Sequence, residues 1–268
     1  MVLFSSRLSR ATAAFGFGLG VSFANAAAAS SVTSELAVKF AGINIAQLKS
    51  VYRIDGNAYS IDGAAKTNGL ASLFASTRAR FRSTGRFSGR AVVPNAHKLT
   101  FSQRRKNGVL SLAFQGGNVV DAVVQPKPKV RKGQVPVLAK HLKAVLDPIS
   151  ALVFPVSAAD VGNARKICNR TVPVYTGASR MNLRFVLKGT RQVKAQGFSG
   201  TAYVCALRYE PVSGHRPTRK DTRFMVANRD MNVTMARIGD SNAYGLFAFR
   251  VKTRRGLARG RATTFAAQ

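Results

Sequence analysis

The chain has 268 residues, 46% of them hydrophobic and 17 of them Phe, so it is long and apolar enough to bury a sizeable core and is not a disordered sequence. It carries 42 Lys and Arg against 10 Asp and Glu, a formal net charge of +32. Such a charge informs about partners rather than fold: it favours nucleic acid for a cytosolic protein, but anionic lipid, lipopolysaccharide or acidic glycans for an exported one.

The first 26 residues have the three parts of a secretory signal. Arg7 and Arg10 lie in a start without acids, residues 11–23 form a short apolar run, and an Ala-Asn-Ala sequence ends at Ala26. The run is rich in glycine and shorter than the roughly 20 apolar residues that a spanning helix needs. We therefore predict a signal peptide over 1–26, cleavage after Ala26, and a periplasmic protein without a spanning segment.

Apolar and polar residues alternate along most of the chain after residue 32. In VYRIDGNAYSID, residues 51–62, an Asp-Gly pair separates two β-rich runs, which is a strong hairpin signal. Short runs of the same kind follow at roughly even spacing, divided by turn residues such as RRKNG and QGGN. This rhythm predicts an antiparallel sandwich or barrel.

The stretch STRARFRSTGRFSGR, residues 76–90, contains five arginines and no acid: Arg78, Arg80, Arg82, Arg86 and Arg90. Strand alternation places Arg78, Arg80 and Arg82 on one face and Ala79 and Phe81 on the other, so the arginines are expected on the wet face of a sheet. Two interpretations stay open, a merely solvated face and an anion-contacting face, since guanidinium groups suit phosphates and carboxylates. The few aromatic residues nearby do not make an RNA-binding signature.

A basic connector rich in proline, residues 125–136, precedes the one convincing helix pattern. A helix over 137–146 is predicted by apolar residues at helical spacing: Leu138, Leu142, Val145 and Leu146. Pro148 should end or kink it, and a second short turn is expected in 149–154. Its single apolar stripe suits packing against a sheet.

Strands are predicted to resume after Pro155. Cys205 falls on the apolar face of such a strand, where a bridge to Cys168 could form beside the core. In an oxidising compartment this pair of cysteines predicts a disulfide, with a reactive thiol beside a histidine as the less favoured alternative. Residues 257–268 form a basic C-terminal tail that is expected to fray, outside a single β-rich domain over 32–256.

The sequence lacks the motifs of common catalytic sites. It has no phosphate-binding loop, dinucleotide fingerprint or nucleophile elbow, and its few acids are scattered. Three isolated histidines make a zinc site unexpected. His141, Asp147 and Ser150 are close in sequence, but one local helix does not easily supply the geometry of a catalytic triad. We therefore predict a non-enzymatic protein with no catalytic residue, metal or cofactor.

Three stretches together resemble an uncharacterised family of exported proteobacterial proteins, common in alphaproteobacteria and known as a domain of unknown function. They are LDPISALVFP (146–155), CNRTVPVYTG (168–177) and YVCALRYEPVSGHRP (203–217). The family is similar in architecture to lipoprotein carriers and to periplasmic β-spiral proteins needed for envelope integrity. The resemblance implies a curved antiparallel sheet around a helical plug, an apolar concavity, a Cys168–Cys205 disulfide and a helical Asp147-Pro148 segment. It brings no catalytic residue.

These observations predict a mainly β fold: a curved antiparallel sheet, as an incomplete barrel or β-spiral, with one central helix in the segment 137–154 on its concave side. The predicted function is to bind an apolar or amphipathic envelope component, a lipid or lipoprotein, in the periplasm. The cationic face would contact anionic lipid or lipopolysaccharide at the membrane periphery. The alternative is a periplasmic structural or protein-interaction module without a small ligand. A nucleic-acid-binding protein that is not exported and a hydrolytic enzyme are less favoured.

Overall fold

Most of the described chain belongs to one sheet of 14 strands, paired antiparallel. The computed structural model describes residues 30–68, 76–103 and 106–268, and the predicted signal peptide lies outside them. The first seven strands are β1 (Ser30–Phe40), β2 (Ile43–Asp55), β3 (Ala58–Thr67), β4 (Thr77–Ser88), β5 (Ala91–Gln103), β6 (Lys106–Gln115) and β7 (Asn118–Gln125). The others are β8 (Phe154–Pro155), β9 (Arg170–Tyr175), β10 (Arg180–Ala195), β11 (Phe198–Ser213), β12 (Met231–Arg237), β13 (Ala243–Thr253) and β14 (Gly256–Ala267).

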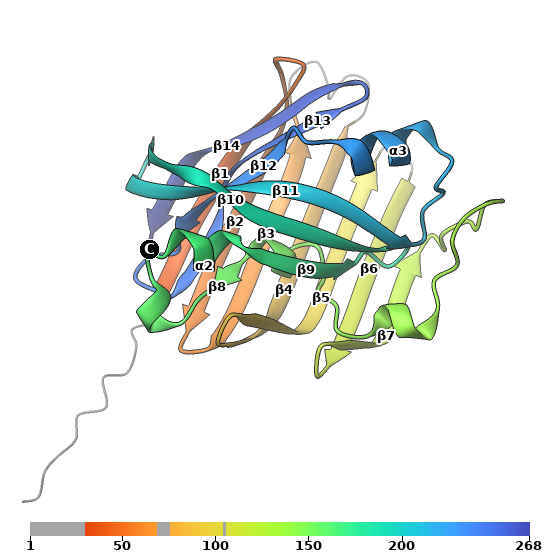
Figure 1. Cartoon of the computed structure of the whole chain (residues 1–268), viewed down its shortest axis with the longest axis horizontal. Helices are drawn as coiled ribbons and strands as arrows, with labels where there is room; N and C mark the ends of the chain where they lie inside the picture. Colours follow the sequence, from red (N-terminus) through yellow and green to blue (C-terminus); the bar gives the residue numbers. More distant parts are fainter. Residues whose placement is uncertain (1–29, 69–75, 104–105) are drawn as a thin grey trace, which may run out of the picture.

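The strand order is that of two meanders joined at one seam. It runs from β7 back to β1 and then from β14 back to β9, with β8 paired to β13 off this path. β1 pairs with β2 on one side and β14 on the other, so the first and last strands of the described chain are neighbours. β7 and β9 end the order, and the sheet is therefore not closed. Figure 1 shows β9, β10 and β11 crossing over the first meander, which confirms the predicted curved, barrel-like fold class.

The core lies where the two meanders face each other. Tyr52, Ile61 and Phe81 of the first meander and Phe247 and Phe265 of the second belong to one buried cluster. Strand alternation produces this arrangement, since every second residue of a strand points to the same face. The predicted Asp55-Gly56 hairpin is present between β2 and β3, with Gly56 at φ 54°.

A long connection between β7 and β9 crosses the inner face of the sheet. It contains two short 3₁₀ helices, η1 (Ala139–Leu142) and η2 (Ser150–Leu152), then β8, a third 3₁₀ helix η3 (Ala158–Asp160) and helix α2 (Ala164–Cys168). We call residues 144–156 the strap. Its backbone is bonded to both meanders: Val145 N donates to Gly117 O (2.9 Å) and Val156 N donates to Asn242 O (2.8 Å).

The prediction of a helix over 137–146 is wrong. Only η1 is helical there, and after it the chain pairs with β9 like a strand at Leu146, whose N donates to Pro173 O and whose O accepts from Tyr175 N, both at 2.8 Å. Pro148 explains part of this, because the residue before a proline avoids the helical conformation. The strand-like hydrogen bonds of Leu146 to β9 are the other reason why the helix does not form. The concave side therefore holds an extended strap with η2, not a central helix.

The prediction of a frayed tail is also wrong. Residues 256–267 form β14, which pairs with both β1 and β13. Gly260, Ala262 and Phe265 are buried, whereas Arg259 and Arg261 point outward. The prediction followed the positive charge of the segment and overlooked the alternation of apolar and polar residues that is typical of a strand. A remaining helix, α3 (Lys220–Ala227), links β11 to β12. Within the described ranges, no helix has the length and apolar composition needed to cross a bilayer.

Candidate ligand-binding cleft

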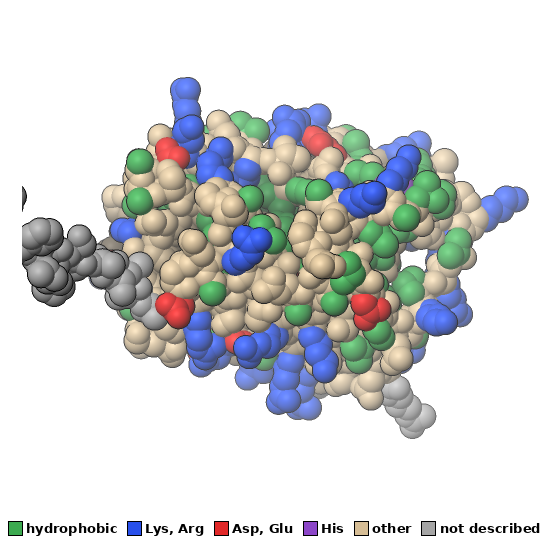
Figure 2. All heavy atoms as spheres, turned by 90° about the horizontal axis from the view of Figure 1, so that it is seen from below, with side chains coloured by type: hydrophobic (Ala, Val, Ile, Leu, Met, Phe, Trp, Pro, Cys, Tyr) green, Lys and Arg blue, Asp and Glu red, His purple; other side chains and the backbone are tan. Residues whose placement is uncertain are grey.

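An apolar cleft of about 520 Å³ lies between the strap, β9 and the turns of two hairpins. Its walls include Arg90 and Ala91 at the β4–β5 turn and Gly116 and Gly117 at the β6–β7 turn. Most of its lining is apolar, from Val92, Val145, Leu146, Val153, Val172 and Pro173. Figure 2 views the end of the molecule that carries these two turns, and shows apolar side chains in its hollows. A cleft of this size and lining is typical of small-molecule sites.

Arg170 is held rigidly at one side of the cleft. Its Nε donates to Ile167 O (2.9 Å), and its Nη2 donates to Pro155 O (3.0 Å) and Lys166 O (3.1 Å). The guanidinium also lies 4.6 Å from the centre of the Phe154 ring, a cation–π contact. Burial and then the nearby charge of Arg90 lower the pKa of Arg170 to about 9. The side chain is therefore fixed in place, but its positive charge is poorly compensated.

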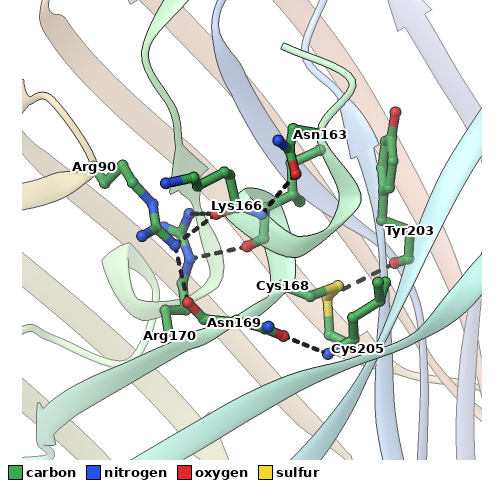
Figure 3. Close-up of a disulfide and its surroundings, with 10 residues drawn as sticks. Arg90, Asn163, Lys166, Cys168, Asn169, Arg170, Tyr203 and Cys205 are labelled. Atoms are coloured by element: carbon green, nitrogen blue, oxygen red, sulfur yellow. Dashed lines mark hydrogen bonds between the residues drawn. A yellow bond between two sulfur atoms is a disulfide. The ribbon is translucent and has the colours of Figure 1, made fainter. Parts of the chain in front are cut away.

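Arg90 reaches the same place from the β4–β5 turn. Its Nη2 donates to Lys166 O (2.6 Å) and Asn169 O (2.9 Å), so Arg90 and Arg170 share the Lys166 carbonyl oxygen. Figure 3 shows the two guanidinium groups next to each other at the end of α2. Arg90 thus does not belong with the other four arginines of the sequence stretch, because the turn after Ser88 carries it away from their face.

A disulfide anchors the helix end on which both arginines depend. Cys168 and Cys205 have sulfur atoms 1.98 Å apart and Cα atoms 5.2 Å apart, and both residues are fully buried. The bond ties the last residue of α2 to β11 in the second meander (Figure 3). The next residue, Asn169, accepts a hydrogen bond from Leu187 N at Oδ1 (2.8 Å). The carbonyl groups that receive the arginines are therefore held in a stable frame. The geometry is that of the predicted disulfide.

The other four predicted arginines share the outer face of the first meander. Arg78, Arg80, Arg82 and Arg86 are exposed, while Phe81 and Phe87 are buried on the inner face. Arg82 pairs with Asp62 (3.1 Å), which also pairs with Arg53 (3.0 Å). Figure 2 shows Lys and Arg side chains projecting along the lower edge of the view.

A shallow groove of about 470 Å³ crosses this outer face. Its lining includes Ala64 and four cationic side chains, those of Lys49, Lys66, Arg78 and Arg80. The one acid in the groove, Glu35, is paired with Lys49 (3.0 Å). The outer face can therefore attract anions, but its side chains are mostly free in solvent and make no built site comparable to the cleft.

A buried polar cluster fastens the strap to the first meander. Ser83 Oγ lies 2.8 Å from His97 Nδ1 and donates to Asp147 Oδ1 (2.9 Å), and His97 Nδ1 is 3.2 Å from the same oxygen. Asp147 Oδ1 also accepts from the backbone N–H groups of Ile149 and Ser150, each at 3.0 Å. Burial alone would raise the pKa of Asp147, but hydrogen bonds from His97 and Ser150 and the attraction of His97 outweigh it and hold this pKa below its ordinary value.

The cluster contains Ser, His and Asp but does not have the geometry of a catalytic triad. In a triad the two ring nitrogens contact different partners, Ser on one side and Asp on the other. Here His97 Nδ1 faces both, Nε2 has no hydrogen-bond partner among the described residues, and all three side chains are at most 2% exposed. His141, the histidine close to Asp147 in sequence, instead accepts a hydrogen bond from Leu138 N.

Comparisons with known proteins agree with this architecture. Residues 35–251 match the family described as a protein of unknown function, DUF3108, and the chain belongs to that family. Among solved structures, it is similar to a beta-barrel-like protein of the domain of unknown function DUF1849 from Brucella abortus, with a TM-score of 0.50 and 11% identity, over 90% of this chain and 98% of that one. This likeness supports the fold alone. No curated protein matches the sequence.

Proposed function

We propose that this protein is a non-enzymatic component of the bacterial cell envelope that binds an apolar or amphipathic partner, a lipid or lipoprotein, in the cleft between strap and β9. The observation that carries the proposal is the cleft itself: mostly apolar walls with a small number of fixed polar groups at one side. Proteins bind lipids and other small amphiphiles in sites of this composition.

The proposal places the protein in the periplasm, with its outer cationic face toward anionic lipid or lipopolysaccharide. The sequence of the first 26 residues supports export, and the disulfide geometry suits an oxidising compartment. Exposed arginines of β4 support contact with anionic head groups, which is stronger at low salt. Determining the N-terminus of the mature protein tests the compartment. A chain that still begins at Met1 in the cytosol would favour nucleic acid instead.

Extraction of the purified protein tests the ligand. Protein taken from the periplasm without detergent should release a stoichiometric lipid or lipopeptide on organic extraction, which mass spectrometry identifies. If none is released and a fluorescent acyl probe such as cis-parinaric acid also fails to bind, the binding function is excluded.

A substitution that fills the cleft makes the test specific to this site. Val92 is half-buried in the cleft wall, so Val92→Trp should displace the acyl probe while leaving the outer face unchanged. Val186→Trp is the control, because Val186 is 42% exposed on β10 and does not line the cleft. Equal probe binding by both variants would place the ligand elsewhere.

A second candidate, an interaction module without a small ligand, is favoured by β7. This strand ends the sheet order, so one edge pairs with no other described strand, and it exposes Val120 and Val123 at 59% and 40%. Unpaired strand edges are templates for partner strands. Crosslinking in intact cells through a photoreactive residue at position 120 separates the candidates: a discrete adduct with another envelope protein, together with no extractable lipid, favours this one.

A further inference from the structure

We propose that the ligand of the cleft carries a compact anionic head group, a carboxylate or phosphate, which binds to Arg90 and Arg170. This inference rests on the proposed function and names the chemical class of its ligand. The observation that carries it is a pair of adjoining guanidinium groups at the wall of an otherwise apolar cleft.

The two arginines have hydrogen-bond donors that the protein does not use. A guanidinium group has five N–H donors in a planar fork. Within the described residues, Arg90 bonds only through Nη2, and Arg170 only through Nε and Nη2. The Nε and Nη1 hydrogens of Arg90 and the Nη1 hydrogens of Arg170 are therefore open to a ligand. Such donors match the oxygens of a carboxylate or phosphate.

The charges of the pair also favour an anion. A chain with 42 Lys and Arg and only 10 Asp and Glu must contain many arginines without an acidic partner, so the lack of one is not by itself evidence for a binding site. What distinguishes these two is that like charges are held against each other, with Arg170 half-buried and Arg90 exposed, while none of the ion pairs in the described ranges includes either one. A bound anion would relieve this repulsion, and its attraction to Arg170 would be stronger than in open solvent because that guanidinium group is partly shielded from water.

The rest of the cleft requires an apolar body attached to the anion. Val92, Val153 and Val172 line the space next to the arginine pair, where a bare inorganic ion would leave apolar surface in water. The arginines are fixed by backbone carbonyl groups and by the disulfide-linked end of α2, so little side-chain order would be lost on binding. The ligand class that fits is an acyl or alkyl chain with one terminal anion.

Calorimetric titration of the mature chain with three matched probes tests this class. Dodecanoate and dodecyl phosphate have an anionic head, dodecanol has a neutral one, and all are used below micellar concentrations. We expect the wild type to bind at least one of the anionic probes ten times more tightly than dodecanol. Arg90→Gln should abolish this preference without weakening dodecanol binding.

A matched control is needed because the net charge of the protein attracts every anion. Arg223→Gln removes the same charge from an exposed position of α3 that does not line the cleft, and should keep the preference. Equal binding of anionic and neutral probes by the wild type, or an equal effect of the two Arg substitutions, overturns the head-group assignment while leaving the apolar cleft in place. Inorganic phosphate that competes as strongly as dodecyl phosphate would make the ligand a free anion. Failure of every probe would exclude the proposed function itself.

Discussion

At the scale of single residues, the inner face of the sheet contains polar side chains at positions where strand alternation calls for core residues. Ser83 and His97 lie directly opposite each other on β4 and β5 and are both buried. Tyr59 Oη and Ser150 Oγ are 2.8 Å apart in the same layer. Buried polar groups are costly unless they are hydrogen-bonded, and Asp147 of the strap supplies the missing acceptor. The cluster therefore specifies where the strap docks.

Asp147→Asn should destabilise the protein at neutral pH, by about 3 kcal/mol if it leaves the buried pair broken. The folded-state pKa of Asp147 lies below its ordinary value of 3.8, so the carboxylate stabilises the fold above that pH and its contribution disappears as the pH falls through the folded pKa. The stability difference between wild type and variant, measured by urea unfolding, should thus be largest near pH 7 and shrink below pH 4.

The exposed Asp121 on β7 provides the control for this experiment. Asp121→Asn should change the unfolding free energy by less than about 0.5 kcal/mol at either pH. A stability difference between the wild type and the Asp147→Asn variant that stays constant from pH 7 to pH 3 would contradict the assigned role of the Asp147 charge.

Three glycines lie across from phenylalanines on neighbouring strands, and the rings cover them. The cross-strand pairs are Gly63 with Phe81, Gly108 with Phe101, and Gly260 with Phe249. At Gly63 an added Cβ would lie 2.6 Å from Lys49 O and still closer to the Phe81 ring. The glycine is needed here for close approach, since its side chain position is already filled.

Gly63→Ala should therefore cost roughly 1–3 kcal/mol in unfolding free energy, as is usual for overpacking. Phe81→Leu makes room at the same place, so the double variant should lose less stability than the two single variants added together. Strict additivity in urea unfolding would show that the ring and the glycine do not compete for this space.

At the scale of elements, the alternation and the turn signals were sufficient to predict the sheet, because strands and hairpins are encoded locally. The β2–β3 hairpin follows from the Asp-Gly turn signal, and the outward arginines of β4 follow from the period-two pattern. The strap could not be predicted in this way: Leu146 has helical spacing to Leu142, but its backbone pairs with β9, which is distant in sequence. Tertiary hydrogen bonds overrode a local helical preference.

The sequence predicts an apolar cavity but not the residues that line it. The family resemblance implies an apolar concavity, but the sequence groups Arg90 with the arginines of β4, and no local pattern places Arg170 beside it. Their meeting depends on the turn at Gly89, with φ 57°, and on the position of α2, which the Cys168–Cys205 link determines. The clue that sequence reasoning passed over was the position of Arg170, two residues after Cys168.

Reduction of the disulfide should destabilise the protein by roughly 4 kcal/mol on the chain-entropy model, given a sequence separation of 37 residues. Urea unfolding with and without a reductant measures this loss. Thiol labelling of the unreduced, unfolded protein should find no reactive sulfur. Labelling of both cysteines without reductant would mean that the native protein is a dithiol and that α2 is held without a covalent link.

At the scale of the whole molecule, the architecture depends on the seam between β1 and β14. The first meander runs continuously from β1 to β7 and the second from β9 to β14, and within the sheet order only the β1–β14 pairing joins them. Cleft and buried polar cluster both lie between the two meanders and need them in register. Arg90 belongs to the first meander and Arg170 to the second. The site that they form therefore depends on β14, although β14 contributes no residue to it.

A chain that stops after Gly256 should therefore lose its cooperative fold, not only its last residues. Without β14, the edges of β1 and β13 would both be unpaired, and buried Phe265 would leave the core. Far-UV circular dichroism, thermal unfolding and limited proteolysis should all report a disordered or aggregated product.

The full-length Arg259→Gln, Arg261→Gln variant is the matched control, because it removes the charges of this segment and keeps the strand. If the truncated chain instead unfolded at the wild-type temperature, the seam would not be what joins the two halves, and the strap alone would have to hold them together.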